Sequence, residues 1–357
     1  MRLKRTLTII LLVIVTLGAL AVLQRLVMPK YQTQLLEGGL IADYYQEPVK
    51  NHDVIFIGDC EVYEDFSPVI LWEEYGITSY IRGSAQQLIW HSYYMLEDTL
   101  RYETPDVVVF NVLSMKYGEP QSEAYNRMAL DAMPLTATKL RAIQASMMDK
   151  EEWLSYIFPL LRFHSRWSEL DSEDFTYLFK RDLITHNGYL MRIDVKPVGT
   201  LPTVKPLADY SFDEICWEYL DKMTELCKNN GIELILVKAP SIYPHWYDEW
   251  DSQIVDYAAE NDLMFFNSLR LTEEIGIDYS TDTYDAGLHM NLSGAEKMSR
   301  YLGRILTDEF GLVDRRQDPA LATLWSGKKA AYEQQKSVQL HELETLGYLK
   351  AFRFVQN

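Results

Sequence analysis

The chain has 357 residues, of which 48% are hydrophobic and 24% are charged. These proportions are ordinary for globular proteins, so they exclude wholesale disorder, collagen-like repeats and a polytopic membrane protein. The formal net charge of −18 repels phosphate backbones and argues against nucleic-acid binding. Three cysteines, Cys60, Cys216 and Cys227, are too few for a disulfide framework, and no CxxC spacing suggests a zinc site. We therefore expect neither a metal nor a cofactor.

An apolar segment lies close to the N-terminus. Leu7–Leu23 contains no charged residue and reaches the minimum of about 17 residues that a membrane-spanning helix needs. Basic residues precede it, and the positive-inside rule then places the N-terminus in the cytoplasm and the body outside. A cleaved signal peptide is the alternative, because Ala19-Leu20-Ala21 resembles a cleavage site. We expect residues 1–28 to form an uncleaved, single-pass anchor in the cell membrane, followed by a polar stalk over residues 29–50.

Five short apolar runs predict the buried strands of a sheet, each beside a glycine, a proline or an Asn-Asp pair. They are Asp53–Ile57, Ile77–Ile81, Asp106–Phe110, Ile232–Val237 and Leu263–Phe266. Helical patterns lie between or after them, at Gln86–Leu100, Phe212–Lys228, Glu249–Glu260 and Leu292–Asp308. This alternation predicts an α/β domain over residues 51–310, with a mostly parallel sheet and helices on both faces.

Two segments depart from this alternation. Residues 117–210 contain several helical pieces and no clear strand, and they predict a helical insertion that forms a cap or lid. Residues 311–357 are charged, with a helix expected near Ala320–Leu343. We interpret this tail as a solvated helix that packs on the body or on a neighbour.

Residues that could perform chemistry follow the predicted strands. Because the carboxyl ends of parallel strands share one edge of a sheet, ligands bind there. The first strand is followed by Cys60, the second by Gly83 and the third by Asn111, while His289 stands just before the last helix of the domain. We expect a thiol, a glycine amide, a carboxamide and an imidazole to meet at this edge.

The order of these residues resembles that of the SGNH, or GDSL-like, hydrolase family. In that family the nucleophile lies in a Gly-Asp-Ser turn, a glycine and an asparagine line the oxyanion hole, and an Asp-x-x-His block precedes the last helix. The resemblance covers about residues 51–310. It makes Cys60 the nucleophile and His289 the base, and it assigns Gly83 and Asn111 to the oxyanion hole. It also implies a flavodoxin-like three-layer sandwich and, with the anchor, a membrane-tethered member.

Two positions depart from the family pattern. Cys60 replaces the serine, and a Cys-His pair is chemically sound because thiolates attack acyl carbons well. Two acidic neighbours nevertheless disfavour the thiolate. Ala286 stands three residues before His289, where the family has its acid. The nearest acid is Asp285, which could orient the imidazole if the loop bulges.

Four further residues are candidates for binding a substrate. Arg162 and His164 lie among aromatic residues inside the insertion, and Lys238 and Ser241 follow the fourth strand before an aromatic-rich loop. Either segment could contact a glycan above the site. The alternatives are a cap helix with a solvated basic face and a loop that closes the core.

These features predict an extracytoplasmic esterase or O-acyltransferase that acts on a cell-surface glycan or wall polymer. Cys60, with His289 as base, would form a thioester and pass the acyl group to water or to a sugar hydroxyl. The alternative is a catalytically inactive module of the same fold that binds a glycan or a partner in a cell-surface polymer assembly. The sequence leaves the oligomeric state open.

Overall fold

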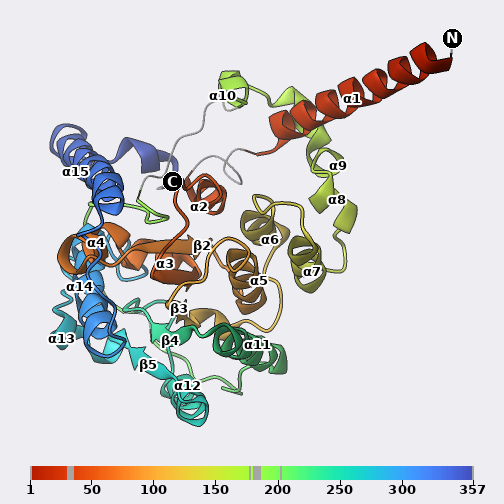
Figure 1. Ribbon diagram of the computed structural model, residues 1–357. Helices are drawn as coiled ribbons and strands as arrows, with labels where there is room; N and C mark the ends of the chain where they lie inside the picture. Colours follow the sequence, from red (N-terminus) through yellow and green to blue (C-terminus); the bar gives the residue numbers. More distant parts are fainter. Residues whose placement is uncertain (1, 30–35, 177, 180–185, 202, 356–357) are drawn as a thin grey trace.

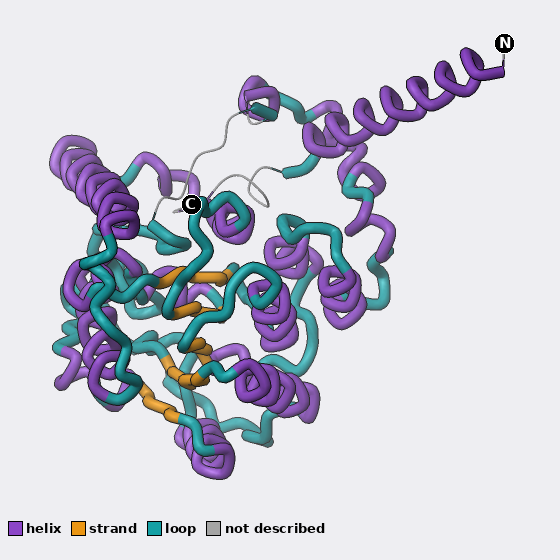
Figure 2. Tube along the Cα trace, in the orientation of Figure 1, coloured by secondary structure: helices purple, strands orange, loops and turns teal. Residues whose placement is uncertain are grey.

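The computed structural model describes residues 2–29, 36–176, 178–179, 186–201 and 203–355. A sheet lies at the centre of the body, and helices surround it (Figure 2). One long helix projects from the body at the N-terminal end (Figure 1).

The sheet has five strands in the order β2-β1-β3-β4-β5, and all neighbouring strands are parallel. They are β1 (Val54–Gly58), β2 (Ser79–Gly83), β3 (Val107–Asn111), β4 (Glu233–Lys238) and β5 (Met264–Asn267). Each begins one or two residues after the start of its predicted apolar run, so the five predicted strands are confirmed. The chain leaves β1 toward β2 on one side and returns to β3 on the other, which creates the topological switch point where ligands bind in such sheets.

Helices cover both faces of the sheet, as predicted. On β1, Ile55 and Ile57 belong to one core, whereas Val54 and Phe56 belong to the other, because successive strand residues point to opposite faces. The first core packs on α5 (Ile89–Thr99), α11 (Glu214–Asn230) and α12 (Asp248–Asn261). The second packs on α3 (Cys60–Asp65), α4 (Pro68–Tyr75), α14 (Leu292–Asp308) and α15 (Pro319–Leu346). The three-layer sandwich is therefore confirmed.

The predicted insertion is helical. Its elements are α6 (Glu123–Leu130), α7 (Ala137–Ser146), α8 (Trp153–Ile157), α9 (Leu160–Phe163), the 3-10 helix η3 (His164–Ser168) and α10 (Ser172–Thr176). Both α6 and α7 pack beside α5, where Leu130 and Ile143 extend the first core. This half of the insertion is thus a lateral extension of one helical layer.

The end of the insertion covers an edge of the sheet. The backbone N–H of Ile81 on β2 donates to Asn187 O at 2.9 Å, and the side chain of Asn187 donates to Ser79 O at 2.8 Å. A Cβ on Gly188 would lie 2.3 Å from Ile81 O, so only glycine allows this approach. The segment satisfies polar groups that an edge strand would otherwise expose.

The N-terminal region contains two helices. The first, α1 (Arg2–Val27), is long and apolar enough to cross a membrane, and its apolar window is not buried in the body. Residues 30–35 of the predicted stalk lie outside the described residues. The rest of that stretch forms α2 (Leu36–Tyr44), whose Ile41 and Tyr44 are fully buried beside β2. A free stalk over residues 36–44 is therefore replaced by a helix of the body, because its apolar side chains enter the core.

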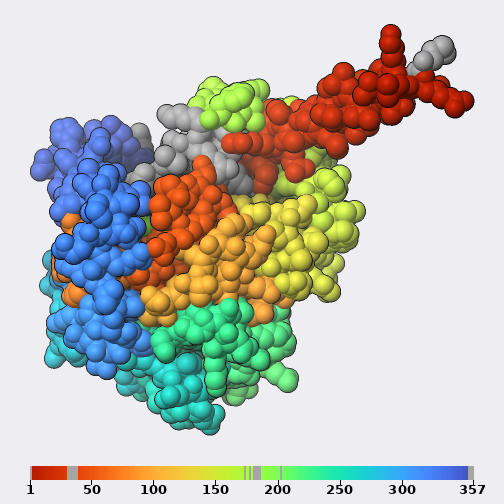
Figure 3. Space-filling view, in the orientation of Figure 1, coloured from red at the N-terminus to blue at the C-terminus, as the bar shows by residue number. Residues whose placement is uncertain are grey.

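Short elements complete the described fold. They are the 3-10 helices η2 (Val112–Lys116), η4 (Ser268–Arg270) and η5 (Lys350–Val355) and the helix α13 (Thr272–Ile275). The C-terminal tail is helical as predicted, with Trp325 and Tyr332 of α15 buried against the second core. In the space-filling view it forms one side of the body, across from α1 (Figure 3).

Candidate active site

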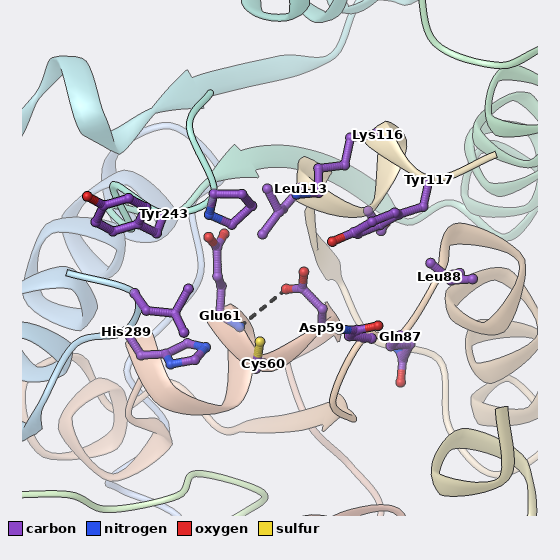
Figure 4. A pocket seen from close by; sticks show the side chains of 14 residues that line it. Asp59, Cys60, Glu61, Gln87, Leu88, Leu113, Lys116, Tyr117, Tyr243 and His289 are labelled. Carbon is purple, nitrogen blue, oxygen red and sulfur yellow. Dashed lines mark hydrogen bonds between the residues drawn. The ribbon is translucent and has the colours of Figure 1, made fainter. Parts of the chain in front are cut away.

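A pocket of about 370 Å³ lies at the switch point of the sheet. Its walls come from the turn between β1 and α3, residues 86–88, residues 113–117 around η2, the Tyr243-Pro244 loop and the loop ending at His289 (Figure 4). These segments are distant in sequence, and the parallel strands bring them to one edge. Cys60 and His289, two of the predicted site residues, both line this pocket.

Cys60 is the first residue of α3 and is half-buried in the pocket. Asp59 caps this short helix, since its Oδ1 accepts a hydrogen bond from the N–H of Glu61 at 3.2 Å. A Cβ on Gly83 would lie only 2.7 Å from a methyl group of Val62. This glycine therefore lets α3 approach β2 closely.

Asp285 and His289 form a tightly closed loop. The Nδ1–H of His289 donates to Asp285 Oδ2 at 2.7 Å, and its backbone N–H donates to Asp285 Oδ1 at 2.8 Å. Between them, Ala286 and Gly287 have φ values of +67° and +98°. These two left-handed residues supply the bulge that brings an acid four residues away into contact with the imidazole.

The imidazole faces the thiol. Figure 4 shows the ring of His289 turned toward the sulfur of Cys60. The Nε2 atom of His289 is buried, and a side-chain interaction between His289 and Cys60 contributes to the pKa shifts of both groups. The other ring nitrogen of His289, Nδ1, lies 3.6 Å from Glu64 Oε2 in addition to its contact with Asp285. The arrangement orders a thiol, an imidazole and a carboxylate as in a nucleophile–base–acid triad.

The charges around the pair determine its resting protonation. Burial raises the pKa of the Cys60 thiol to about 12, and Asp59 adds to this effect while His289 opposes it. Burial disfavours the imidazolium of His289, but Glu64, Cys60 and Asp285 together outweigh it and raise the pKa of His289 well above its usual value. The charge on each of these two groups therefore affects the pKa of the other.

Tyr284 is a further neighbour of the imidazole that the sequence analysis did not single out. Its ring is nearly parallel to that of His289, with an interplanar angle of 14°, and its hydroxyl donates to Glu64. The hydroxyl oxygen of Tyr284 also lies 3.3 Å from Nδ1 of His289. Burial and the adjacent Glu64 raise the pKa of Tyr284, so the phenol stays neutral and remains a hydrogen-bond donor to Glu64.

Asn111 lies beside the site, but its amide is engaged elsewhere. Its Nδ2 donates to Asp59 Oδ1 at 3.0 Å and to Glu61 Oε2 at 2.7 Å, while its Oδ1 accepts from Ala239 N at 3.2 Å. Asn111 is fully buried and, like Gly83, does not line the pocket. In this conformation the carboxamide holds two acidic side chains and is not directed at a substrate oxygen.

Lys238 and Ser241 lie behind the pocket wall. Lys238 Nζ donates to Glu61 Oε1 at 2.9 Å and to Ala239 O at 2.7 Å, and both charged side chains are buried. The hydroxyl of Ser241 donates to Asp65 Oδ2 at 3.3 Å, and Asp65 Oδ1 accepts from the backbone N–H of Met290. Both predicted substrate residues instead secure carboxylates of α3.

Arg162 and His164 are not brought to the pocket. Both are exposed, Arg162 pairs with Glu123 at 2.8 Å, and the Nδ1 of His164 contacts Leu161 O at 3.0 Å. None of the described residues between 118 and 210 lines the pocket. The physical reason is that α8, α9 and α10 continue away from the sheet toward α1, as Figure 1 shows.

Lys116 and Tyr117 line the pocket and were not predicted. Burial lowers the pKa of Lys116 to about 8, although Asp59 and Glu61 counteract this effect. Its Nζ lies 4.6 Å from the centroid of the Tyr117 ring. Lys116 is the last residue of η2, the 3-10 helix that begins directly after Asn111, and Tyr117 follows it. Extending the strand-end argument past the first residue would have identified them. Together they present a cation and an aromatic face to a ligand.

The described residues contain no group of three or more His, Cys, Asp or Glu side chains arranged to hold a metal ion. Asp59 and Glu61 are instead occupied with Asn111 and Lys238. Burial and the neighbouring Glu61 raise the pKa of Asp59 to about 7, and the hydrogen bond from Asn111 counteracts this increase.

No model of a known protein family matches the sequence, and no curated protein matches it. Among solved structures, the chain is similar to a protein described as a lipolytic protein of the G-D-S-L family from Desulfitobacterium hafniense. The identity is 14%, the match covers 72% of this chain and 100% of that chain, and the TM-score is 0.35. A GDSL-like lipase from Bacteroides thetaiotaomicron is 14% identical, with 76% of this chain and 100% of that chain covered and a TM-score of 0.34.

Proposed function

We propose that this protein is a membrane-anchored esterase or O-acyltransferase of the SGNH type, with Cys60 as nucleophile, His289 as base and Asp285 as the orienting acid. The observation that carries the proposal is the 2.7 Å contact between Asp285 and Nδ1 of His289, with the imidazole ring turned toward Cys60 (Figure 4). A base held by a third group beside a nucleophile is the arrangement that acyl transfer requires.

The first half-reaction forms a thioester. Neutral His289 takes the proton of the Cys60 thiol on Nε2, and the sulfur attacks the ester carbonyl carbon. The carbon–sulfur bond forms while the carbonyl electron pair moves to oxygen. When that pair returns, the carbon–oxygen bond to the alcohol breaks, and the alkoxide leaves with the proton from Nε2.

The second half-reaction restores the thiol. Water or a sugar hydroxyl gives its proton to Nε2 of His289 and attacks the thioester carbon. The carbon–sulfur bond then breaks, and the departing sulfur of Cys60 takes the proton back. The net reaction is ester hydrolysis with water and acyl transfer with a sugar hydroxyl, and no other reactant is consumed.

The walls of the pocket support a glycan or wall polymer as substrate. Tyr117 and Tyr243 provide aromatic rings on which sugar faces can pack, and Lys116 provides a cation for an anionic group. The apolar helix α1, with basic residues only before and after its apolar run, supports anchoring in the cell membrane with the body outside the cytoplasm.

The test uses the full-length protein in detergent micelles with p-nitrophenyl acetate. We expect Cys60→Ala to abolish hydrolysis and to remove the acetylated peptide that mass spectrometry detects in the wild type after rapid acid quenching. Cys227→Ala is the matched control, because Cys227 is buried on α11 and does not line the pocket. Undiminished hydrolysis by Cys60→Ala would exclude Cys60 as the nucleophile.

A second candidate is a catalytically inactive module that binds a glycan or a partner. Two observations favour it: both N–H groups of Asn111 are occupied by carboxylates, and the pKa of Cys60 is raised to about 12. Iodoacetamide labelling across pH distinguishes the candidates. A thiol that reacts only well above its ordinary pKa of about 8.5, in a protein without esterase activity, would favour binding.

A further inference from the structure

The helices α8 to α10 expose an unusual number of large apolar side chains. Trp153, Phe158, Leu161, Trp167 and Phe175 are each about half exposed. We refer to these five side chains as the aromatic platform. Single exposed apolar residues are common on protein surfaces, but a group with two tryptophans within one short segment indicates an interaction surface.

The platform lies at the base of α1. This helix contacts α9, η3 and α10, and its last residues, Leu26 and Val27, are buried. The guanidinium of Arg166 donates to Val27 O at 2.9 Å, which satisfies a carbonyl at the helix end. Figures 1 and 3 both show α10 beside the end of α1 that meets the body.

The length of α1 fixes the depth of this contact in a membrane. A hydrocarbon core of about 30 Å takes about 20 helical residues at about 1.5 Å per residue. Counted from Arg5, that length ends near Arg25, which is the first charged residue after the apolar run. The segment that carries the platform contacts α1 through α9, η3 and α10, and Arg166 binds Val27 O, close to Arg25. We therefore expect this segment to lie at the level of the lipid headgroups.

We propose that the aromatic platform binds the membrane interface and holds the body in a fixed orientation on the bilayer. The occupant is the boundary between phospholipid headgroups and acyl chains, where Trp and other amphipathic rings are enriched and where short helices lie flat. The inference rests on the anchoring by α1 stated above. It makes α1 and the platform two attachments, which would restrict rotation of the pocket relative to the membrane.

The chain carries natural probes for this contact. It has 8 tryptophans, none of them in α1, and only Trp153 and Trp167 are exposed. The experiment places the full-length protein in nanodiscs of phosphatidylcholine and phosphatidylglycerol whose acyl chains are brominated near the carbonyl end. Bromine quenches tryptophan fluorescence on contact, so we expect quenching limited to the share emitted by these two residues.

Matched variants assign the quenching. W153F combined with W167F should remove most of the bromine-dependent quenching, whereas W217F should leave it unchanged. Trp217 is a suitable control because it is half-buried on α11, which lies far from α1 in Figure 1. Equal bromine-dependent quenching in the double variant and the control would overturn the proposal, as would its absence from the wild type.

The design separates this proposal from the anchoring itself. If α1 does not span a bilayer, the chain will not co-purify with nanodiscs at all, which contradicts the anchor. If the protein enters nanodiscs but bromine does not quench its tryptophans, only the proposal for the aromatic platform is contradicted. Native mass spectrometry that then finds two chains per disc would assign the surface to a second copy of this chain. If circular dichroism shows that the double variant does not fold, the wild type provides the test. Its tryptophan quenching is compared between lipids brominated near the carbonyl end and lipids brominated near the chain end. A site at the membrane interface requires stronger quenching by the label near the carbonyl end.

Discussion

Asp285 holds His289 at two points, with its two carboxylate oxygens accepting from the backbone N–H at 2.8 Å and from Nδ1 at 2.7 Å. The acid stands four residues before the histidine, and the left-handed conformations of Ala286 and Gly287 close the loop between them. Contacts within this loop thereby orient the imidazole, and Glu64 of α3 lies 3.6 Å from the same Nδ1.

This relationship predicts the effect of Asp285→Asn. The amide can donate to Nδ1 and favour the wrong tautomer, so the proton-accepting role of Nε2 is impaired. We expect esterase activity to fall by about 10²-fold, the lower end of what general base catalysis contributes. Steady-state kinetics of the full-length protein measure it, with the exposed Asp278→Asn in the same loop as control. Equal activity in both variants would remove Asp285 from the proposed triad.

A second prediction concerns pH. His289 faces Glu64, Asp285, the thiol of Cys60 and the phenol of Tyr284, and the acidic groups raise its pKa. Only neutral imidazole accepts the thiol proton, so activity should increase as pH rises through this raised pKa. Glu64→Gln removes one negative charge, which lowers the pKa of His289 and should shift the rising limb of the kcat/KM profile to lower pH. An unmoved limb would show that another group controls it.

Gly83 provides a stability test that does not depend on catalysis. Gly83→Ala places a Cβ 2.7 Å from Val62 Cγ2 and 3.1 Å from Gly58 O. Overpacking of this kind costs about 1–3 kcal/mol in the free energy of unfolding. Val62→Ala in the same chain should recover part of the loss, because it removes the nearest methyl group but not the backbone contact. Urea unfolding of the wild type, the two single variants and the double variant measures the coupling between the two substitutions. If their losses in the free energy of unfolding are strictly additive, the steric explanation is contradicted.

The buried pair of Lys238 and Glu61 yields a further prediction. Lys238→Met leaves the Glu61 carboxylate without its cation inside the protein, and loss of one partner of a buried pair costs roughly 3–5 kcal/mol. Adding Glu61→Gln should restore much of the stability, because no unpaired charge remains. Thermal unfolding compares the two variants with the wild type. A single variant as stable as the wild type would show that water or another group compensates the charge.

Local sequence patterns were sufficient for the central fold. The five apolar runs became strands because a strand buried on both faces needs continuous apolar residues. Asn291 caps α14 through its own side chain, whose Oδ1 accepts from Ser293 N at 3.0 Å. Cys216 and Cys227, which stand in an apolar helical pattern, are buried. Each of these outcomes depends on interactions within a few residues or on hydrophobicity alone.

The sequence by itself therefore determined the sheet, its helical layers and the edge where Cys60 and His289 meet. Only the tertiary structure decided that Lys238 faces Glu61, that Asn111 holds two carboxylates and that Arg162 lies away from the pocket near α1. Hydrophobic periodicity is a property of neighbouring residues, whereas the partner of a polar side chain comes from any segment that packing brings near. The pairing of Lys238 with Glu61, 177 residues apart, illustrates that difference.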